Sequence, residues 1–319
     1  MNRLLQLLQD GRFHSGQELG EQFGMSRSSI WKHLQRLESE MGLQIYRVPG
    51  RGYRLAEPLS LLDPDRLAPA LARLGWALHL GDSFDSTNAE ALRLLQSHVA
   101  APFLVAGEVQ TQGRGRRGRQ WISPYAQNLC FSLAVKVAGG TGQLAGMSLV
   151  VGLAVMQALR AQGVGDVGVK WPNDVYAAGR KIAGILLELT GDPADVCHVV
   201  IGVGVNVNML ASDVEVGQPW TSVRRETGML VDRSLLLIAL GESLQRYLAR
   251  HAEMGFAALR EEWEAGHLWQ GRSCTLSTGS QEHSGIVVGV DEGGALRLAV
   301  GGCERSFSGG ELSLRLDAK

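Results

Sequence analysis

The segment Gln110-Thr111-Gln112-Gly113-Arg114-Gly115-Arg116-Arg117-Gly118-Arg119-Gln120-Trp121 lies between two apolar runs, 105–109 and 129–135. From Gly113 to Trp121 it holds four arginines, three glycines and no acidic residue. Arginine offers forked donors to phosphate or carboxylate oxygens, and glycine allows a backbone to approach a ligand closely. Because two predicted strands enclose it, we interpret this segment as a loop that binds an anionic ligand and is mobile when empty. The alternative, an Arg-Gly tether for nucleic acid, fits a short enclosed loop less well.

Two polar motifs flank this loop in the sequence. Asp85-Ser86-Thr87-Asn88 precedes a helical pattern over 89–95, so its commoner meaning is a helix cap. Its three small polar groups also suit a ureido or amide ring. Lys170-Trp171-Pro172-Asn173-Asp174 ends a strand-like run and leads into a predicted hairpin that turns at 177–179.

Lys181 stands at the start of the second, otherwise apolar strand of that hairpin. A lysine in such a place is more often a solvated strand end. With Asp174 nearby across the hairpin, Lys181 becomes a candidate polariser of a carboxylate or phosphate. Gly202-Val203-Gly204 lies inside the apolar run 199–207, and no helical pattern follows it, so it is not a dinucleotide-binding fingerprint.

The N-terminal region predicts two helices joined by a glycine turn, which is a helix-turn-helix pattern. Ser15-Gly16-Gln17-Glu18 is a capping box, in which Ser15 caps the helix start and Glu18 reaches back. Gly24 breaks this helix, and Ser26 caps the next one. The predicted buried stripe of the second helix is Ile30, Leu34 and Leu37.

The runs 43–48 and 53–55 then predict a β-hairpin wing whose arginines would contact phosphates. A helix of this kind fits a major groove, with residues near its N-terminus facing base edges. Residues 1–58 hold eight Lys/Arg against six Asp/Glu, so charge alone leaves open a protein-interaction domain with a solvated basic face. The candidate DNA contacts are Arg27, Ser28, Ser29, Lys32 and Arg51, whereas Trp31 and His33 are candidates for packing.

The whole chain has an ordinary globular composition, with 319 residues, 45% hydrophobic and 20% charged. Its net charge of −1 means that any nucleic-acid site is a local patch. The four cysteines form no Cys-x-x-Cys pair, which predicts a reducing compartment and no protein zinc site. We expect a cytoplasmic protein without signal peptide or membrane span. A proline-bracketed linker, 57–64, supports units at 1–62, 63–269 and 270–319.

These motifs together resemble the bacterial family of bifunctional biotin–protein ligases and biotin-operon repressors. The resemblance spans nearly the whole chain and is most specific in the arginine loop and the Lys170–Asp174 segment. The further segments that carry it are Asp85–Asn88, Arg180–Leu186, Gly202–Asn206, Phe13–Gly16, Gly24–Arg27 and Gly309–Arg315.

The resemblance implies an α+β multidomain fold. It consists of an N-terminal winged helix-turn-helix, a central class II synthetase-like α/β domain with helices on one side of a mixed sheet, and a C-terminal SH3-like β barrel. It also implies two half-reactions. Biotin and ATP, with Mg²⁺, give biotinyl-5′-AMP and pyrophosphate, and a lysine of the biotin carboxyl carrier protein of acetyl-CoA carboxylase then takes the biotinyl group. Operator DNA and a homodimer promoted by biotinyl-5′-AMP are the other implied partners.

The resemblance also implies roles for individual residues. Lys181 contacts the biotin carboxylate and bridging phosphate, and Asp174 orients or deprotonates the incoming lysine. The residues implied at the biotin ring are Ser86, Thr87, Asn88 and Gln110. Those implied to close over the adenylate are Arg114, Gly115 and Arg116. Those implied on the nucleotide side are Asn173, Asn206 and Trp220, although the segment 209–219 departs from the family pattern, as does Gln120.

Three functions stay open at this stage. The first is a ligase that also represses transcription, which the intact arginine loop and wing favour. The second is a biotin ligase without a gene-regulatory role. The third is a biotin-sensing transcription factor built on an inactive ligase fold. Lipoate ligases share the central fold, but the arginine loop and the added N-terminal region favour biotin.

Overall fold

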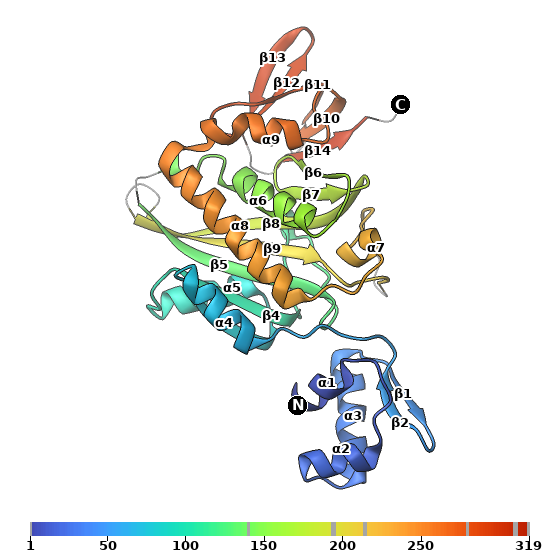
Figure 1. The fold of residues 1–319 in the computed structure, drawn as a ribbon. Coiled ribbons are helices and arrows are strands. Elements are labelled where there is room, and N and C mark those ends of the chain that lie inside the picture. Colours follow the sequence, from blue (N-terminus) through green and yellow to red (C-terminus); the bar gives the residue numbers. More distant parts are fainter. Residues whose placement is uncertain are drawn as a thin grey trace.

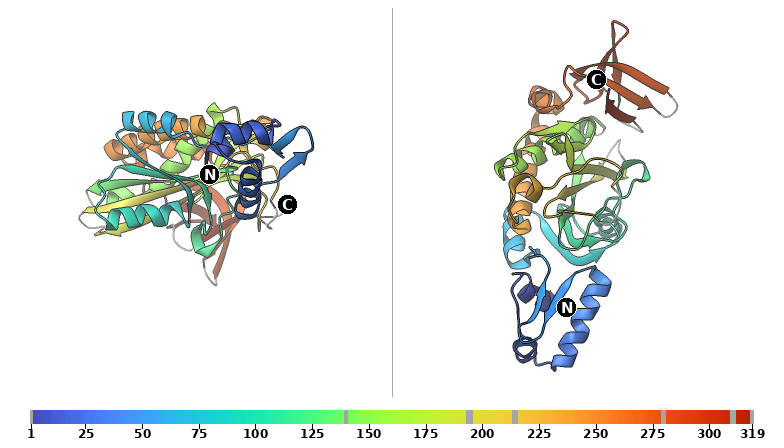
Figure 2. Two further views of the ribbon diagram at one scale, coloured as in Figure 1. Left: turned by 90° about the horizontal axis from the view of Figure 1, so that it is seen from below. Right: turned by 90° about the vertical axis from the view of Figure 1, so that its right-hand side faces the viewer.

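The structure is a computed structural model that describes residues 2–138, 141–192, 196–212, 216–278, 281–308 and 312–317. Figures 1 and 2 show three parts in a row: an N-terminal head, a central sheet with helices, and a C-terminal β domain. Residues 309–311 lie outside the described residues. They belong to the C-terminal segment, 309–315, that carries part of the resemblance to the ligase family. Within the described ranges, no helix is long and apolar enough to cross a membrane.

The head is the predicted winged helix. Its elements are α1 (Asn2–Leu8), α2 (Gly16–Phe23), α3 (Arg27–Met41), β1 (Ile45–Val48) and β2 (Gly52–Leu55). The Ser15 side chain accepts from the backbone N–H of Glu18, and Ser26 accepts from that of Ser29, so both predicted N-caps are confirmed. The antiparallel pair β1–β2 forms the wing.

The core of the head is the predicted stripe of α3. Ile30, Leu34 and Leu37 are all buried, and they pack with residues of α1 and of the wing. Trp31, by contrast, is 42% exposed. This exposure does not support the packing role considered for Trp31, whereas His33 is half-buried.

A seven-stranded mixed sheet forms the centre of the molecule, in the order β3-β4-β5-β9-β8-β7-β6. Only β3 and β4 run parallel among these described neighbours. The strands are β3 (Ala77–Phe84), β4 (Phe103–Gln110), β5 (Asn128–Ala138), β6 (Val167–Lys170), β7 (Asp174–Ala177), β8 (Arg180–Gly191) and β9 (Val196–Asn206). The hairpin expected after Asp174 is therefore β7–β8.

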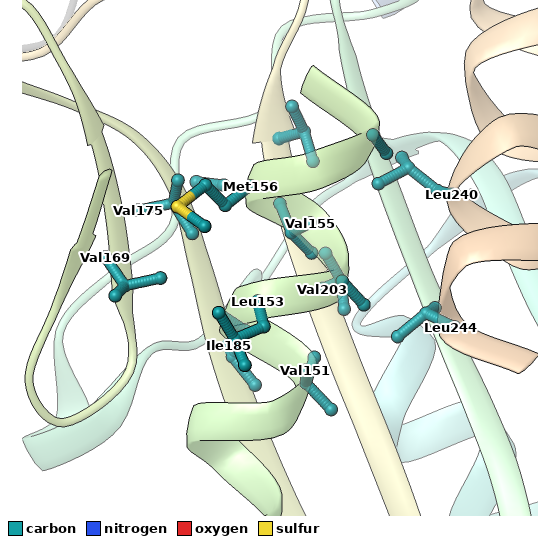
Figure 3. Close-up of a cluster of buried hydrophobic side chains, with 14 of the residues drawn as sticks. Val151, Leu153, Val155, Met156, Val169, Val175, Ile185, Val203, Leu240 and Leu244 are labelled. Carbon is teal, nitrogen blue, oxygen red and sulfur yellow. The ribbon is translucent and has the colours of Figure 1, made fainter. Parts of the chain in front are cut away.

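Helices cover both faces of this sheet. On one face lie α4 (Pro64–Arg73), α6 (Met147–Ala161) and α8 (Arg233–Met254). Figure 3 shows α6 side chains such as Val155 between the sheet residue Val203 and Leu240 of α8, inside the main core. The other face carries α5 (Thr87–Gln96), whose Ala91 packs with Phe103 and Val105 of β4. The expectation of helices on one side only is thus corrected, because β4 is apolar on both faces.

Short elements and the C-terminal domain complete the fold. The short helices are α7 (Val223–Thr227), α9 (Arg260–Gly266), η1 (Arg116–Gly118), η2 (Thr141–Leu144) and η3 (Phe256–Leu259). The C-terminal strands are β10 (Ser273–Thr278), β11 (Gln281–Val290), β12 (Leu296–Val300), β13 (Cys303–Phe307) and β14 (Leu312–Leu316). They form an antiparallel sheet in the order β13-β12-β11-β10-β14, which fits the expected SH3-like barrel.

A buried ion pair fixes the linker between the head and the sheet. Arg233, at the start of α8, is 0% exposed and pairs with Glu108 of β4. The same guanidinium donates to the backbone oxygens of Ser60, at 2.6 Å, and Asn128, at 2.8 Å. Glu108 also accepts from the backbone N–H of Leu62 at 2.7 Å. The linker is therefore held by the strand that leads into the arginine loop.

Candidate functional site

A cavity of about 700 Å³ opens on the α5 face of the central sheet. Every residue predicted for catalysis or for biotin and nucleotide binding lines it, so the fold brings together side chains from segments far apart in the sequence. These residues are Ser86, Thr87, Asn88, Gln110, Arg114, Gly115, Arg116, Asn173, Asp174, Lys181, Asn206 and Trp220.

Glycines form part of the floor of this cavity. The Trp121 ring lies so close to β8 and β9 that an added Cβ would meet it at 3.3 Å on Gly184 and at 2.5 Å on Gly204. The apparent Gly-x-Gly motif of β9 therefore makes room for an aromatic side chain at the end of the arginine loop. This close approach explains why glycine interrupts an otherwise apolar strand.

The arginine loop forms a small closed turn above the floor. Arg114 and Gln120 pair as an isolated bridge, and the backbone N–H of Gly115 donates to Arg119 O at 2.7 Å. Arg116 donates to Asn173 Oδ1 at 3.0 Å, which connects the loop to the Lys170–Asp174 segment. Burial lowers the pKa of the Arg116 guanidinium from its usual value, but arginine stays charged at neutral pH. The loop thus places a fixed positive charge over the cavity.

Lys181 and Asp174 form an ion pair inside the cavity. The Lys181 Nζ lies 2.7 Å from Asp174 Oδ1, and both side chains are 15% exposed. Lys181 also lies over the Trp121 ring, 5.8 Å from its centroid. Asp174 is the only carboxylate among the described lining residues. Among the described residues, seven cationic side chains line the same cavity, namely Arg114, Arg116, Arg117, Arg119, Lys170, Lys181 and Arg315.

Small polar groups line the opposite, α5 end. Ser86 caps α5 through a 3.5 Å contact with the backbone N–H of Ala89, as its motif predicts. Thr87 donates through both its backbone N–H, at 2.8 Å, and its hydroxyl, at 3.0 Å, to Gln110 Oε1. The cavity thus has one polar, uncharged end and one strongly cationic end.

The predicted nucleotide-side residues form a third part of the wall. Asn206 Nδ2 donates to Thr221 O at 3.0 Å, and Asn173 Nδ2 donates to Ile185 O at 2.7 Å. Trp220 pairs beside Lys181 as an isolated bridge, and its ring lies 4.7 Å from the Arg225 guanidinium. Both asparagines therefore position backbone segments, and Trp220 presents an aromatic face near the cationic end.

Sequence reasoning missed several residues of the site. Ser132, buried on β5, contacts Thr87 and Asn88, and Glu188 on β8 contacts Asn88. Each is a polar residue inside an apolar strand run, and this was the only signal the sequence carried. Lys170 Nζ lies 5.0 Å from the centroid of the Tyr176 ring and 4.6 Å from that of the Trp269 ring, and burial lowers the pKa of Lys170.

The predicted DNA contacts lie in two places on the head: four are in the first two turns of α3, and Arg51 is in the turn between β1 and β2. Arg27, Ser28, Lys32 and Arg51 are exposed, and Ser29 is half-buried. Among the described residues, no carboxylate lies within ion-pair distance of Arg27, Lys32 or Arg51, whereas Arg47 pairs with Glu38. The surface thus keeps three uncompensated cations for an anionic partner.

Comparison with known proteins identifies the class of protein that combines such a head with such a cavity and C-terminal domain. Residues 80–206 match the biotin/lipoate A/B protein ligase family, residues 1–54 match a helix-turn-helix (HTH) domain, and residues 271–315 match the biotin protein ligase C-terminal domain. The chain belongs to the biotin protein ligases of this family.

Within the family, the chain is similar to the bifunctional ligase/repressor proteins. It is 40% identical to the bifunctional ligase/repressor BirA of Salmonella typhimurium over 98% of this chain and 96% of the relative. It is 39% identical to the Escherichia coli protein of the same name, with the same two coverages. A solved biotin protein ligase from Aquifex aeolicus, in complex with biotin and ATP, has a TM-score of 0.66 and 29% identity. The match covers 75% of this chain and 99% of that one.

Proposed function

We propose that this protein joins biotin to a lysine of a biotin carboxyl carrier protein in two steps. The biotin carboxylate attacks the α-phosphate of ATP to give biotinyl-5′-AMP and pyrophosphate. The ε-amine of the carrier lysine then attacks the mixed anhydride and releases AMP. The supporting observation is one cavity with a neutral polar end for the ring, seven cations for the carboxylate and phosphates, and an aromatic wall.

The first step gathers negative charge, so electrostatic positioning is the main demand on the site. Lys181 reaches the point where carboxylate and α-phosphate meet, because Asp174 holds its ammonium at 2.7 Å. Arg114, Gly115 and Arg116 close over the adenylate, and this excludes water that would hydrolyse the anhydride. Asn173 and Asn206 shape the nucleotide side, and Trp220 stacks near the adenine.

In the second step an amine must lose a proton as it attacks. Asp174 is the only described carboxylate of the cavity wall, and we assign to it the orientation or deprotonation of the incoming lysine. Once the nucleotide phosphates compete for Lys181, Asp174 is free to accept a hydrogen bond from the carrier amine. Transfer therefore depends on the same ion pair as activation.

Magnesium fits this site as a companion of ATP. Mg²⁺ is usually held by one or two carboxylates together with substrate phosphates. The described lining offers one carboxylate, and the described residues contain no group of three or more metal-ligating side chains. The ion would therefore arrive on the nucleotide phosphates and would neutralise charge on the leaving pyrophosphate, and Asp174 is the one carboxylate that the described part of the wall could offer it.

We further propose that the head makes the protein a biotin-responsive repressor. Arg27, Ser28, Ser29 and Lys32 would read operator bases, and Arg51 would contact a phosphate. Biotinyl-5′-AMP would promote a homodimer that binds a two-fold operator. The bifunctional relatives over nearly the whole chain support this proposal over a ligase without regulation, and the intact Lys181 and arginine loop support it over an inactive sensor. We place both activities in the cytoplasm.

The first half-reaction is tested by incubating the protein with biotin, ATP and Mg²⁺ and analysing the bound small molecule by mass spectrometry. We expect biotinyl-5′-AMP and one equivalent of pyrophosphate. A parallel incubation with lipoate should give no adenylate. Lipoyl-AMP in place of biotinyl-AMP would move the protein to the lipoate branch of its family, and no adenylate with either acid would contradict the ligase proposal.

A further inference from the structure

The wing of the head has two faces with different surroundings. Ile45 and Leu55, paired across β1 and β2, are buried on the inner face, where Arg47 also forms an ion pair with α3. Because neighbouring residues of a strand point to opposite faces, the next pair, Tyr46 and Arg54, lies on the outer face. Tyr46 is 48% exposed, and Figure 2 (left) shows the wing projecting from the head. The outer face is therefore accessible to a partner.

Aromatic rings and guanidinium groups alternate on this outer face. An isolated antiparallel bridge at His14 adds the segment of Phe13 to the side of β2 that β1 leaves open. The Arg54 guanidinium lies 5.1 Å from the centroid of the Phe13 ring and 5.1 Å from that of the Tyr46 ring. The Arg51 guanidinium lies 4.4 Å from the centroid of the Phe13 ring. Tyr46, Arg54, Phe13 and Arg51 thus form one row of stacked groups, the wing stack.

The two arginines of the wing stack have no acidic partner among the described residues. The ion pairs within the described head are His14–Asp10, Arg36–Glu40 and Arg47–Glu38. Arg54 Nε is buried and has no hydrogen-bond partner within the described part of the chain. A guanidinium that stacks through its flat faces keeps the N–H donors at its edges available for an acceptor. The wing stack therefore orders two positive charges without neutralising them.

We propose that the wing stack is a preorganised clamp for the phosphate backbone of duplex DNA. Arg51 and Arg54 each bind a phosphate, and Phe13 and Tyr46 are positioning residues that hold the two guanidinium groups. Stacking orders these long side chains before DNA arrives, so less conformational entropy is lost on binding. The edge of a guanidinium donates two parallel hydrogen bonds to phosphate oxygens. This inference rests on the proposed repressor function, because it names the side chains by which the wing holds the operator.

The distribution of charge favours a polyanion over a single acidic side chain. Arg27 and Lys32 at the start of α3 carry two more uncompensated cations within the same helix-turn-helix domain. Duplex DNA carries about one negative charge per 1.7 Å of helix axis, so it can bind all of these cations at once. Phosphate contacts carry no sequence information. The wing stack should therefore contribute equally to the binding of any duplex, whereas α3 discriminates between sequences.

The test uses the full chain, with biotin and ATP present, and measures its binding to two fluorescent DNA duplexes of unrelated sequence at several salt concentrations. Arg54→Ala should reduce the salt slope of log K by about one per bound protomer on both duplexes, because one phosphate contact is lost. Phe13→Leu keeps both charges, so the slope should stay the same. Its affinity should fall roughly tenfold, because both guanidinium groups must then be ordered during binding. Phe13→Tyr keeps the ring and should bind as the wild type does.

The matched control is Arg47→Gln/Glu38→Gln, which removes a compensated pair of charges from the inner face of the same hairpin. It should leave the salt slope unchanged. Melting temperatures are measured for every variant. If Phe13→Leu destabilises the head, Tyr46→Leu provides the same test at an exposed position, through Arg54 alone.

The decisive comparison repeats Phe13→Leu in an Arg51→Ala/Arg54→Ala background. With no guanidinium left to position, the leucine should cause no further loss of affinity. An equal further loss there would overturn the proposal, as would an Arg54→Ala slope equal to that of the wild type or an effect confined to one duplex. A wild-type protein that binds neither duplex would contradict the repressor proposal as well, whereas wild-type binding with an unchanged Arg54→Ala slope would overturn this inference alone.

Discussion

Lys181 Nζ and Asp174 Oδ1 lie 2.7 Å apart across the β7–β8 hairpin, in a cavity where Asp174 is the only carboxylate of the described wall. Opposite charges at this distance interact strongly where water is partly excluded. In the proposed reaction, this pair lies where the biotin carboxylate, the nucleotide and the incoming amine meet, and an anionic ligand competes with Asp174 for the ammonium.

Replacement of Lys181 by alanine removes the charge from this junction. We expect biotin-dependent pyrophosphate release to fall by roughly 10²–10³-fold, the usual cost of losing a group that stabilises developing charge. Initial-rate assays of pyrophosphate release at saturating ATP measure this decrease directly. Release at the wild-type rate would show that Lys181 does not act in activation.

Arg116 connects the arginine loop to Asn173. Its loss should therefore loosen the closure of this loop over the adenylate more than it slows the formation of the adenylate. We expect Arg116→Gly to form adenylate but to release it into solution. Lysines of a bystander protein would then become biotinylated, which streptavidin blotting detects. Labelling that stays confined to the carrier would contradict the lid role.

Lys32 tests the proposed DNA surface. We expect Lys32→Ala to weaken operator binding by about 1–3 kcal/mol and to relax the base preference at one operator position. Gel shifts with the operator and with single-base variants of it provide both quantities. Removal of residues 1–58 should abolish binding altogether. Binding that persists without these residues would place the DNA site elsewhere.

His267 makes stability depend on pH at the junction with the C-terminal domain. Its ring is buried against Trp263, at 4.6 Å between centroids, and burial lowers its pKa to about 4. The unfolded chain takes up the proton near pH 6.5 and the folded one does not, so stability falls as pH drops from 6.5 toward 4. We expect a loss of about 2 kcal/mol between pH 7 and pH 5 from this group.

The matched variant for this effect is His267→Phe, which keeps a stacked ring but cannot titrate. Urea unfolding at pH 7 and pH 5 should give a smaller pH difference for the variant than for the wild type. An equal pH difference in both proteins would mean that other groups carry the dependence.

Arg233→Met would leave Glu108 buried without its partner. Breaking a buried pair in this way costs about 3–5 kcal/mol. Because Arg233 also holds Ser60, the linker should become more sensitive to limited proteolysis. The double variant Arg233→Met/Glu108→Gln should recover part of the stability. A single variant as stable as the wild type would exclude a structural role for the pair.

The local patterns of the sequence predicted those parts of the structure that depend on neighbours in the chain. Ser15 and Ser26 cap helices where their motifs indicated, and Asp174 faces Lys181 because one short hairpin joins them. Contacts across the sheet were beyond such reasoning. Ser132 and Glu188 lie on strands that are far apart in the sequence, and only the order β5-β9-β8 with α5 above it brings both to Asn88.

Two further features were not predicted from the sequence. Arg233, at the start of α8, is buried because Glu108 and two carbonyl oxygens satisfy its guanidinium. The second helical face of the sheet was also unexpected. The continuous apolar run of β4, rather than an alternating one, was the signal that both faces are covered.

The most direct test of the proposed function is to mix the protein with biotin, ATP, Mg²⁺ and a biotin carboxyl carrier domain, and to weigh the carrier by intact mass spectrometry. We predict a mass gain of one biotinyl group, on one lysine, that is absent when that lysine is replaced by arginine or when Lys181 is replaced by alanine. A carrier of unchanged mass, despite wild-type protein that binds both biotin and ATP, would contradict the assignment of this chain as a biotin–protein ligase.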